Sequence, residues 1–191
     1  FYQLCTEFGK FVFRRDFPEI LDDLPCKLNS HFYFSHFTSP FVFDFVAEAY
    51  KHKDENGKVK VKPIVGCEFY LTSDRHQKTF TKEHRDKRYH QILLAKNETG
   101  YKNLVKLTSL GFIEGMYSKY PRIDKELILR HHEGLIATTC CLGASVPQAI
   151  LRHGEEEGEN EFKWWLNIFQ QDFYVELQRH GMAEQDKVNL V

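Results

Sequence analysis

The chain has 191 residues, of which 42% are hydrophobic and 28% charged, so a disordered tail is excluded and one medium-sized domain with a core is expected. Its 26 Lys and Arg residues stand against 27 Asp and Glu residues, so no global field draws the surface onto nucleic acid and any such contact must be local. The five cysteines have no small-scaffold spacing and no apolar run or signal-peptide pattern is present, which predicts a cytoplasmic protein without membrane contact.

The first forty residues differ from the rest of the sequence. Neither helical nor alternating periodicity is sustained beyond Phe17, apart from a short helical possibility at 18–24. We leave residues 1–40 unassigned and expect the recognisable domain over 41–191.

From residue 41 onward, short apolar runs alternate with helical patterns, an arrangement that builds a parallel sheet and predicts an α/β fold. A polar stretch at 73–88 mixes both charges, which is typical of a solvated loop. The strands are expected at 62–71, 89–95, 134–139 and 172–178, and the helices at 41–53, 100–112, from the cap Asp124 to about His131, at 146–152, at 162–171 after an acidic run, and from near Ala183.

Two residues on neighbouring predicted strands are candidates for binding a metal ion. Glu68 lies at the end of an apolar strand, where a projecting carboxylate is well placed to ligate a cation, although a solvent-facing residue at a strand end has the same pattern. His90 opens the next strand, and an imidazole beside a carboxylate is a usual way to hold zinc or manganese. A lone histidine there is more often a surface or core residue, so both interpretations stay open.

The adjacent cysteines Cys140 and Cys141 follow the strand expected at 134–139 and precede Leu-Gly. Because neighbouring side chains on a strand point to opposite faces, one thiolate should point toward the same end of the sheet as Glu68 and His90. The alternative is that both are small buried hydrophobic residues, which is the commoner fate of cysteine.

Two further sets of side chains have weaker claims. Glu176 and His180 flank the end of the last expected strand and could reach a site at its mouth, or could lie in a solvated turn. Several basic residues near tyrosines could bind a nucleic-acid backbone and stack bases, although lysines at these spacings are also ordinary on a helix surface. This set comprises Lys102, Lys106, Lys119, Arg122, Tyr101, Tyr117 and Tyr120.

Four segments taken together resemble the polymerase and histidinol phosphatase (PHP) domain of bacterial DNA polymerase III α subunits. Their order and spacing fit that family, and the helix at 43–53 resembles the one that follows its second metal-binding motif, so the likeness covers roughly three quarters of the chain. The segments are KPIVGCEFYLT at 62–72, HQILLAKNETGYKNLVKLTSLGFIEGMYSKYPRID at 90–124, EGLIATTCCLGASVP at 133–147 and FYVELQRHGMAEQDKVN at 173–189.

The resemblance implies an irregular (β/α)₇ barrel with a polynuclear metal site at the C-terminal ends of its strands. It also implies that Glu68, His90 and Cys141 occupy three of the ligand positions, because the family pattern has a cysteine immediately before Leu-Gly. The divalent metal expected from such ligands is zinc or manganese.

Other parts of the family pattern are missing. The His-x-His and Thr-Asp-His motifs appear nowhere in residues 1–42, and no ligand role is carried onto His31 or His36. The closing Asp-x-His motif should come after the segment at 173–189. We therefore expect a fragment with an incomplete barrel and an incomplete metal site.

Three functions follow from the resemblance. In the first, the parent protein extends DNA by nucleotidyl transfer, and this part of its PHP domain meets DNA and other replisome subunits through the full-length polymerase. A complete site would support 3′–5′ exonuclease or phosphoesterase chemistry, but the isolated chain should be inactive. The second is a non-catalytic structural and interaction module of the polymerase. The third, a free-standing PHP phosphoesterase, is disfavoured by the polymerase-like segment from His90 to Asp124.

Overall fold

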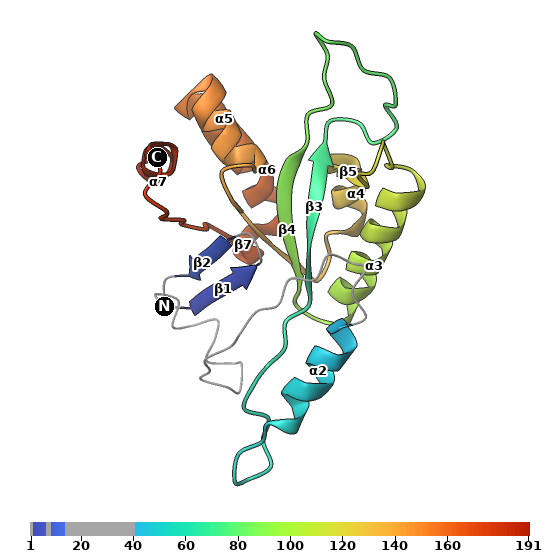
Figure 1. Cartoon of the computed structure of the whole chain (residues 1–191), viewed down its shortest axis with the longest axis vertical. Coiled ribbons are helices and arrows are strands. Elements are labelled where there is room, and N and C mark those ends of the chain that lie inside the picture. Colours follow the sequence, from blue (N-terminus) through green and yellow to red (C-terminus); the bar gives the residue numbers. More distant parts are fainter. Residues whose placement is uncertain (1, 7–8, 14–40) are drawn as a thin grey trace. The chain divides into compact units, whose positions relative to one another are not determined.

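The computed structural model describes residues 2–6, 9–13 and 41–191 (Figure 1). The chain divides into two units, residues 1–65 and residues 66–191, which are described separately below. Among the described residues, no helix has the length and apolar character needed to cross a membrane.

In the first unit, a two-stranded antiparallel hairpin occupies part of the segment that the sequence left unassigned. The helix expected at 41–53 is confirmed and ends two residues earlier. The helical possibility at 18–24 lies outside the described residues, as do His31 and His36. The elements are β1 (Tyr2–Thr6), β2 (Gly9–Phe13) and α2 (Phe41–Lys51).

The second unit is built on a five-stranded sheet in the order β5-β3-β4-β6-β7 (Figure 1). The α/β class is confirmed. Among the described residues the sheet is open, with β5 and β7 at its edges, so the (β/α)₇ barrel stays a prediction. The strands are β3 (Gly66–Thr72), β4 (Tyr89–Ala95), β5 (Arg122–Asp124), β6 (Leu135–Thr138) and β7 (Phe173–Tyr174).

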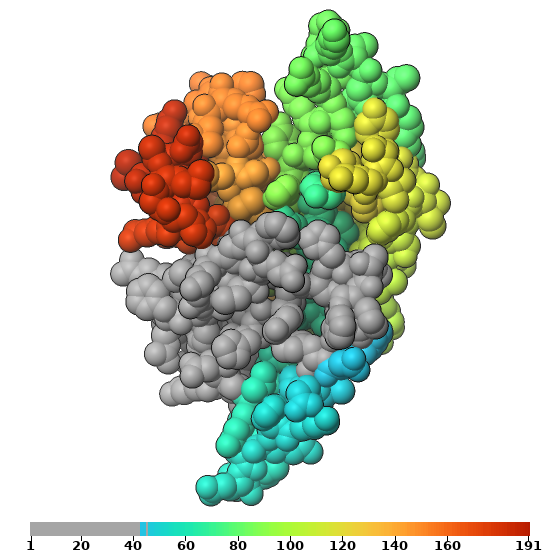
Figure 2. Space-filling model, viewed as in Figure 1, coloured from blue at the N-terminus to red at the C-terminus, as the bar shows by residue number. Residues whose placement is uncertain are grey.

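The expectation of a parallel sheet is wrong, because the sheet is mixed. β3 pairs with β5, and β6 with β7, in parallel, whereas β4 runs antiparallel to both β3 and β6. The reason is the connection between β3 and β4: no helix separates them, so loop 73–88 brings the chain straight back beside β3. Figure 2 shows this loop, in green, projecting from the unit.

Helices α3 and α4 begin at side-chain caps. The Asn97 side chain accepts a hydrogen bond from the Gly100 amide, and the Asp124 side chain accepts one from the Leu127 amide, both at 3.0 Å. The acidic run expected to precede a helix instead forms the first turn of α6, where carboxylates favour the positive end of the helix dipole. The helices are α3 (Glu98–Ile113), α4 (Lys125–His131), α5 (Ser145–His153), α6 (Glu155–Phe169), the 3₁₀ helix η1 (Gln170–Asp172) and α7 (Ala183–Asn189).

Alternate residues of the strands separate the sheet into two faces. One face is apolar and packs against α3, α4, α5 and α6 to form the core. The opposite face, which we call the polar face, carries Glu68 and Tyr70 of β3 and His90 of β4, because Tyr70 and His90 are paired across the two strands. The core includes Cys67, Phe69, Leu71, Leu93, Leu104, Leu107, Ile123, Ile128, Ala137 and Trp165.

Two buried arginines correct the prediction that loop 73–88 is simply solvated. The Arg75 side chain is 4% exposed and pairs with Asp124 at 2.9 Å and Glu114 at 2.7 Å. Arg122, predicted to belong to a nucleic-acid surface, is fully buried and pairs with Asp86 of the loop at 2.8 Å. Because buried charges must be paired, these contacts fasten the loop to the body of the unit.

Candidate functional site

The three residues predicted as metal ligands lie together. Glu68 comes from β3, His90 from β4 and Cys141 from the turn after β6. The Nδ1 atom of His90 is 2.9 Å from Glu68 Oε1 and 3.5 Å from Cys141 Sγ. We call Glu68, His90 and Cys141 the cluster.

The backbone around His90 explains why Cys141 reaches it. The His90 amide donates to the Gly143 carbonyl at 3.0 Å, which ties the turn after β6 to the start of β4. Cys140 adopts a left-handed conformation with φ of 55°, an uncommon state for a residue other than glycine and one found at functional sites. Its amide donates to Thr138 Oγ1 at 3.0 Å, so the strained turn is held in place.

The position of the cluster in the sheet differs from the expectation. Glu68 was expected at a strand end, but it is the third residue of β3. His90 is the second residue of β4, as expected, and the antiparallel direction of β4 pairs it with Tyr70 near the C-terminal end of β3. The cluster is therefore assembled across an antiparallel pair and a neighbouring turn.

Each member of the His90–Cys141 pair favours the charged form of the other. Hydrogen bonds with Cys141 and Glu68 raise the pKa of His90 to about 10. Hydrogen bonds from Cys140, His90 and the Gly143 amide lower the pKa of Cys141 to about 5. At neutral pH the pair is a thiolate beside an imidazolium.

Glu176, which had only a weak claim from the sequence, lies next to the cluster. It lies in the extended segment after β7, is 6% exposed, and accepts hydrogen bonds from Thr138 Oγ1 at 2.9 Å and Gln178 Nε2 at 2.8 Å. Burial raises its pKa to about 7, and the charges of Cys141 and Glu68 act in the same direction. The signal in the sequence is the alternation through 173–178, which places Glu176 on a buried side.

His180, the partner of Glu176 in the sequence argument, has different surroundings. It is exposed, and its Nδ1 atom is 2.7 Å from Gln185 Nε2 of α7. Thr138 and Thr139 were not singled out from the sequence, yet they bind the Glu176 side chain and amide respectively. The polar run Thr-Thr-Cys-Cys at the end of β6 is the signal that could have found them.

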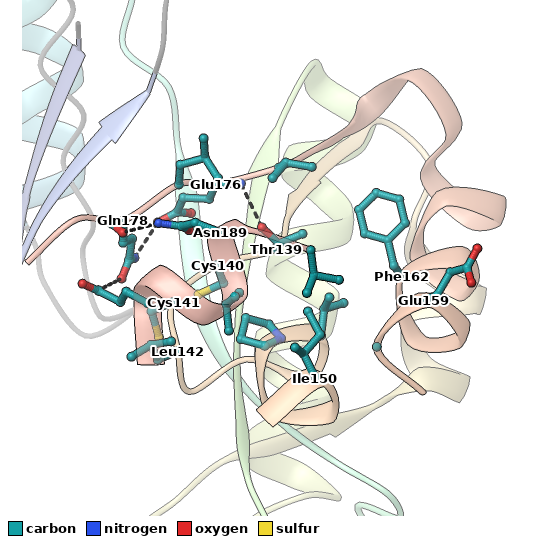
Figure 3. A pocket seen from close by; sticks show the side chains of 18 residues that line it. Thr139, Cys140, Cys141, Leu142, Ile150, Glu159, Phe162, Glu176, Gln178 and Asn189 are labelled. Atoms are coloured by element: carbon teal, nitrogen blue, oxygen red, sulfur yellow. Dashed lines mark hydrogen bonds between the residues drawn. The ribbon is translucent and has the colours of Figure 1, made fainter. Parts of the chain in front are cut away.

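A cavity of about 270 Å³ lies beside the cluster, among α5, α6, α7 and the segment after β7 (Figure 3). Its walls are mainly apolar, with Val146, Ile150 and Phe162 among them, whereas Cys141 and Glu176 supply polar groups. Such a cavity suits an apolar group more than a charged one.

The donor atoms of the cluster satisfy only part of what a metal needs. A tetrahedral zinc ion bound at about 2.0 Å to nitrogen and about 2.3 Å to sulfur would hold these atoms about 3.5 Å apart. The 3.5 Å between His90 Nδ1 and Cys141 Sγ agrees with this separation, but Glu68 contacts the same nitrogen at hydrogen-bond distance. Within the part of the chain that the structure describes, no group of three or more His, Cys, Asp or Glu side chains could hold a metal ion. In the described arrangement the three side chains are hydrogen-bonded to one another around His90.

Comparison with known proteins shows which family and which proteins the chain is similar to. The sequence profile of the PHP domain matches residues 29–180. Proteins named DNA polymerase III subunit alpha are similar to it: 46% identity with that of Borreliella burgdorferi over 144 residues, 74% of this chain and 12% of the relative. For Thermus aquaticus the identity is 45% over 132 residues, 69% of this chain and 11% of the relative. For Aquifex aeolicus it is 43% over 135 residues, 68% of this chain and 12% of the relative. The chain thus spans about a tenth of the length of the curated relatives it matches.

Proposed function

This chain belongs to the PHP domain family, and from that premise we propose that it is part of the PHP domain of a bacterial replicative DNA polymerase. In that setting Glu68, His90 and Cys141 contribute to the domain's metal site. DNA and other replisome subunits are the proposed partners, reached through the full-length protein.

One observation carries the assignment of the three ligands. Glu68, His90 and Cys141 are far apart in the sequence, where each was a weak candidate until the resemblance grouped them, yet their side chains meet around one nitrogen atom. A carboxylate, an imidazole and a thiolate are the donor types that zinc accepts in proteins. The low pKa of Cys141 supports the role, because a cysteine ligand must be deprotonated.

We propose that the isolated chain does not hydrolyse phosphoester bonds. The support is in the sequence: the His-x-His and Thr-Asp-His motifs expected to supply further ligands occur nowhere in residues 1–42. The hydrogen bonds to Cys141 and Glu68 also favour a protonated His90, and an imidazole must be neutral to bind a metal ion.

A second candidate is a non-catalytic module that braces the polymerase. The observation in its favour is a group of exposed apolar side chains in the last part of the chain, where the sheet ends at β7. Exposed apolar surface of this kind marks contacts with other protein surfaces. The residues are Val175, Leu177, Met182, Leu190 and Val191, which are 54%, 37%, 45%, 88% and 58% exposed.

The first test measures metal content by elemental analysis and 3′-exonuclease activity on single-stranded DNA. The isolated chain should hold less than one zinc or manganese ion per molecule and show no activity. Stoichiometric metal together with nuclease activity would show that the proposal of inactivity is wrong.

The second test uses a chimera in which residues 62–189 replace the matching segment of a relative's α subunit. We expect the chimera to extend primers and bind metal, and the Glu68→Ala/His90→Ala variant to lose that metal. The control Glu133→Ala/His153→Ala removes an exposed carboxylate and an exposed imidazole and should keep it. Equal metal content in both variants would refute the ligand assignment.

A further inference from the structure

A row of cations and aromatic rings leads away from the cluster along the polar face. The guanidinium carbon of Arg88 lies 3.6 Å from the centre of the Tyr120 ring, and Lys119 Nζ lies 5.6 Å from the same centre. Both distances are within the range of cation–π attraction. The guanidinium of Arg88 lies over the face of the Tyr120 ring, and we call these two side chains the platform.

Tyr70 connects this platform to the cluster. Its ring meets the Tyr120 ring edge to face at 5.2 Å and the His90 ring edge to face at 5.7 Å. These four side chains, Arg88, Tyr120, Tyr70 and His90, are each partly exposed. The row is thus accessible along its length, and it ends at His90, which contacts Glu68 and Cys141.

Loop 73–88 adds positive charge next to the platform. Lys82, Arg85 and Lys87 are exposed, and none of the carboxylates in the described part of the chain forms an ion pair with them. Lys119 is also exposed and has no such ion pair. The local surplus of positive charge contrasts with the near-neutral chain as a whole.

The buried side chain of Arg122 holds the platform in place through Asp86. Arg122 binds Asp86 at 2.8 Å, and the other oxygen of Asp86 lies 3.4 Å from Arg88. Asp86 therefore links Arg88 to Arg122, whose side chain is fully buried (0% exposed). A rigid aromatic and cationic surface loses little conformational entropy when a ligand binds.

Only some of the basic and aromatic residues predicted to bind nucleic acid lie near the platform. Arg122 is buried, and Tyr117 packs against Phe80. Lys102 pairs with Glu98 on the outer side of α3, so it lies on a helix surface. Lys106 and Tyr101 are likewise exposed on α3. Lys119 and Tyr120 are the members that contact Arg88 or Tyr70 or share the Tyr120 ring with them.

We propose that Lys119, Tyr120, Arg88 and Tyr70 bind single-stranded nucleic acid, with bases stacked on the platform and phosphates beside the exposed cations of loop 73–88. Flat rings interleaved with cations are the combination that single strands recognise, because their bases are open to stacking. A duplex hides its bases, and an acidic peptide would use the cations but not the rings. The inference goes beyond the proposed function, since it needs neither a metal ion nor the rest of a polymerase.

The test is fluorescence anisotropy of the full chain with a labelled oligothymidylate of about 20 nucleotides, at about 50 and 150 mM salt. Binding should weaken as salt rises. The Tyr120→Leu variant should bind roughly 5- to 100-fold more weakly because a stacking partner is lost. Tyr120→Phe keeps the ring and should bind like the wild type, which separates stacking from any effect on folding. Tyr50→Leu, which removes an exposed tyrosine of α2, is the matched control and should leave binding unchanged.

Four results would overturn the inference. They are no binding at the lower salt concentration, equal affinity of the Tyr120→Leu variant, tighter binding of a duplex, and equal binding of poly-glutamate. The last result would identify an acidic protein as the partner. None of these outcomes depends on metal content or nuclease activity, so failure here is distinguishable from failure of the proposed function.

Discussion

The two faces of the sheet in residues 66–191 are made by alternate residues of the same strands. In β3, Cys67 and Phe69 face the helices and are buried in the core, whereas Glu68 and Tyr70 lie on the polar face and are partly exposed. The apolar face gains free energy from burial, which stabilises the fold whatever the protonation state of its neighbours. The polar face holds charges whose balance depends on pH.

The polar face also contains features that cost stability. Cys140 has a left-handed backbone, and Glu176 is a carboxylate buried at a raised pKa. Natural proteins depart from the most stable arrangement mainly at functional sites. The contrast indicates that the apolar face supplies the stability of the fold, whereas the polar face holds the functional site.

The largest expected effect comes from breaking the apolar face. Leu107 of α3 is completely buried in the core. Leu107→Ala should lower the free energy of unfolding by about 3 kcal/mol, because it removes buried methyl groups and leaves a cavity. The loss should be similar across the pH range and can be measured by urea denaturation.

A matched substitution on the same helix controls for helix propensity. Ile113 is 78% exposed, so Ile113→Ala should change the free energy of unfolding by no more than about 0.5 kcal/mol. If both variants lost the same stability, the apolar face would not be the source of the fold's free energy.

A smaller and pH-dependent effect is expected on the polar face. The folded pKa of Glu176 is about 7, above its ordinary value of 4.5, so the folded state binds the proton more tightly. The stability that this group contributes is therefore fully present below about pH 4.5 and is lost as pH rises through about 7. Glu176→Gln cannot ionise and should gain on the order of 2 kcal/mol relative to the wild type between these limits.

The measurement is urea denaturation of both proteins from about pH 4.5 to 8. The variant-minus-wild-type difference isolates Glu176 from the opposing contributions of His90 and Cys141. Glu133→Gln, which alters an exposed carboxylate, should stay within about 0.5 kcal/mol of the wild type. A difference for Glu176→Gln that did not change with pH would contradict the raised pKa.

Elements that bury one face are predictable from the sequence. The helical spacing at 100–112 predicts α3, and the apolar run at 89–95 coincides with β4. The direction of β4 is not visible in its own residues, because it depends on what lies between it and β3. The sequence indicates the direction of β4 only indirectly, because residues 73–88 have no helical pattern.

Long-range pairs are harder to predict. Arg75 is buried because Asp124, 49 residues later, neutralises it, and no local pattern encodes such a partner. Glu68, His90 and Cys141 had only weak signals as single residues, and the family resemblance was needed to group them. Arg88 was missed because its role depends on contact with Tyr120, which only the folded chain shows.

The smallest expected effect tests the charge state of the polar face directly, through the rate at which iodoacetamide alkylates Cys141. Because its pKa is lowered to about 5, Cys141 should react at an almost constant rate above about pH 6. Cys67 is buried, which raises its pKa to about 12, so it should react far more slowly. Peptide mapping by mass spectrometry separates the two sites.

His90→Ala removes one of the hydrogen bonds that favour the thiolate and leaves those from Cys140 and Gly143. The midpoint of the rate profile should therefore rise by roughly one pH unit and not return fully to the value of an ordinary cysteine. His153→Ala, which alters an exposed histidine of α5, should leave the profile unchanged. If His90→Ala behaved like this control, the thiolate of Cys141 would owe its charge to the turn after β6 alone. The polar face would then contain an isolated reactive cysteine and not a cluster that couples three side chains.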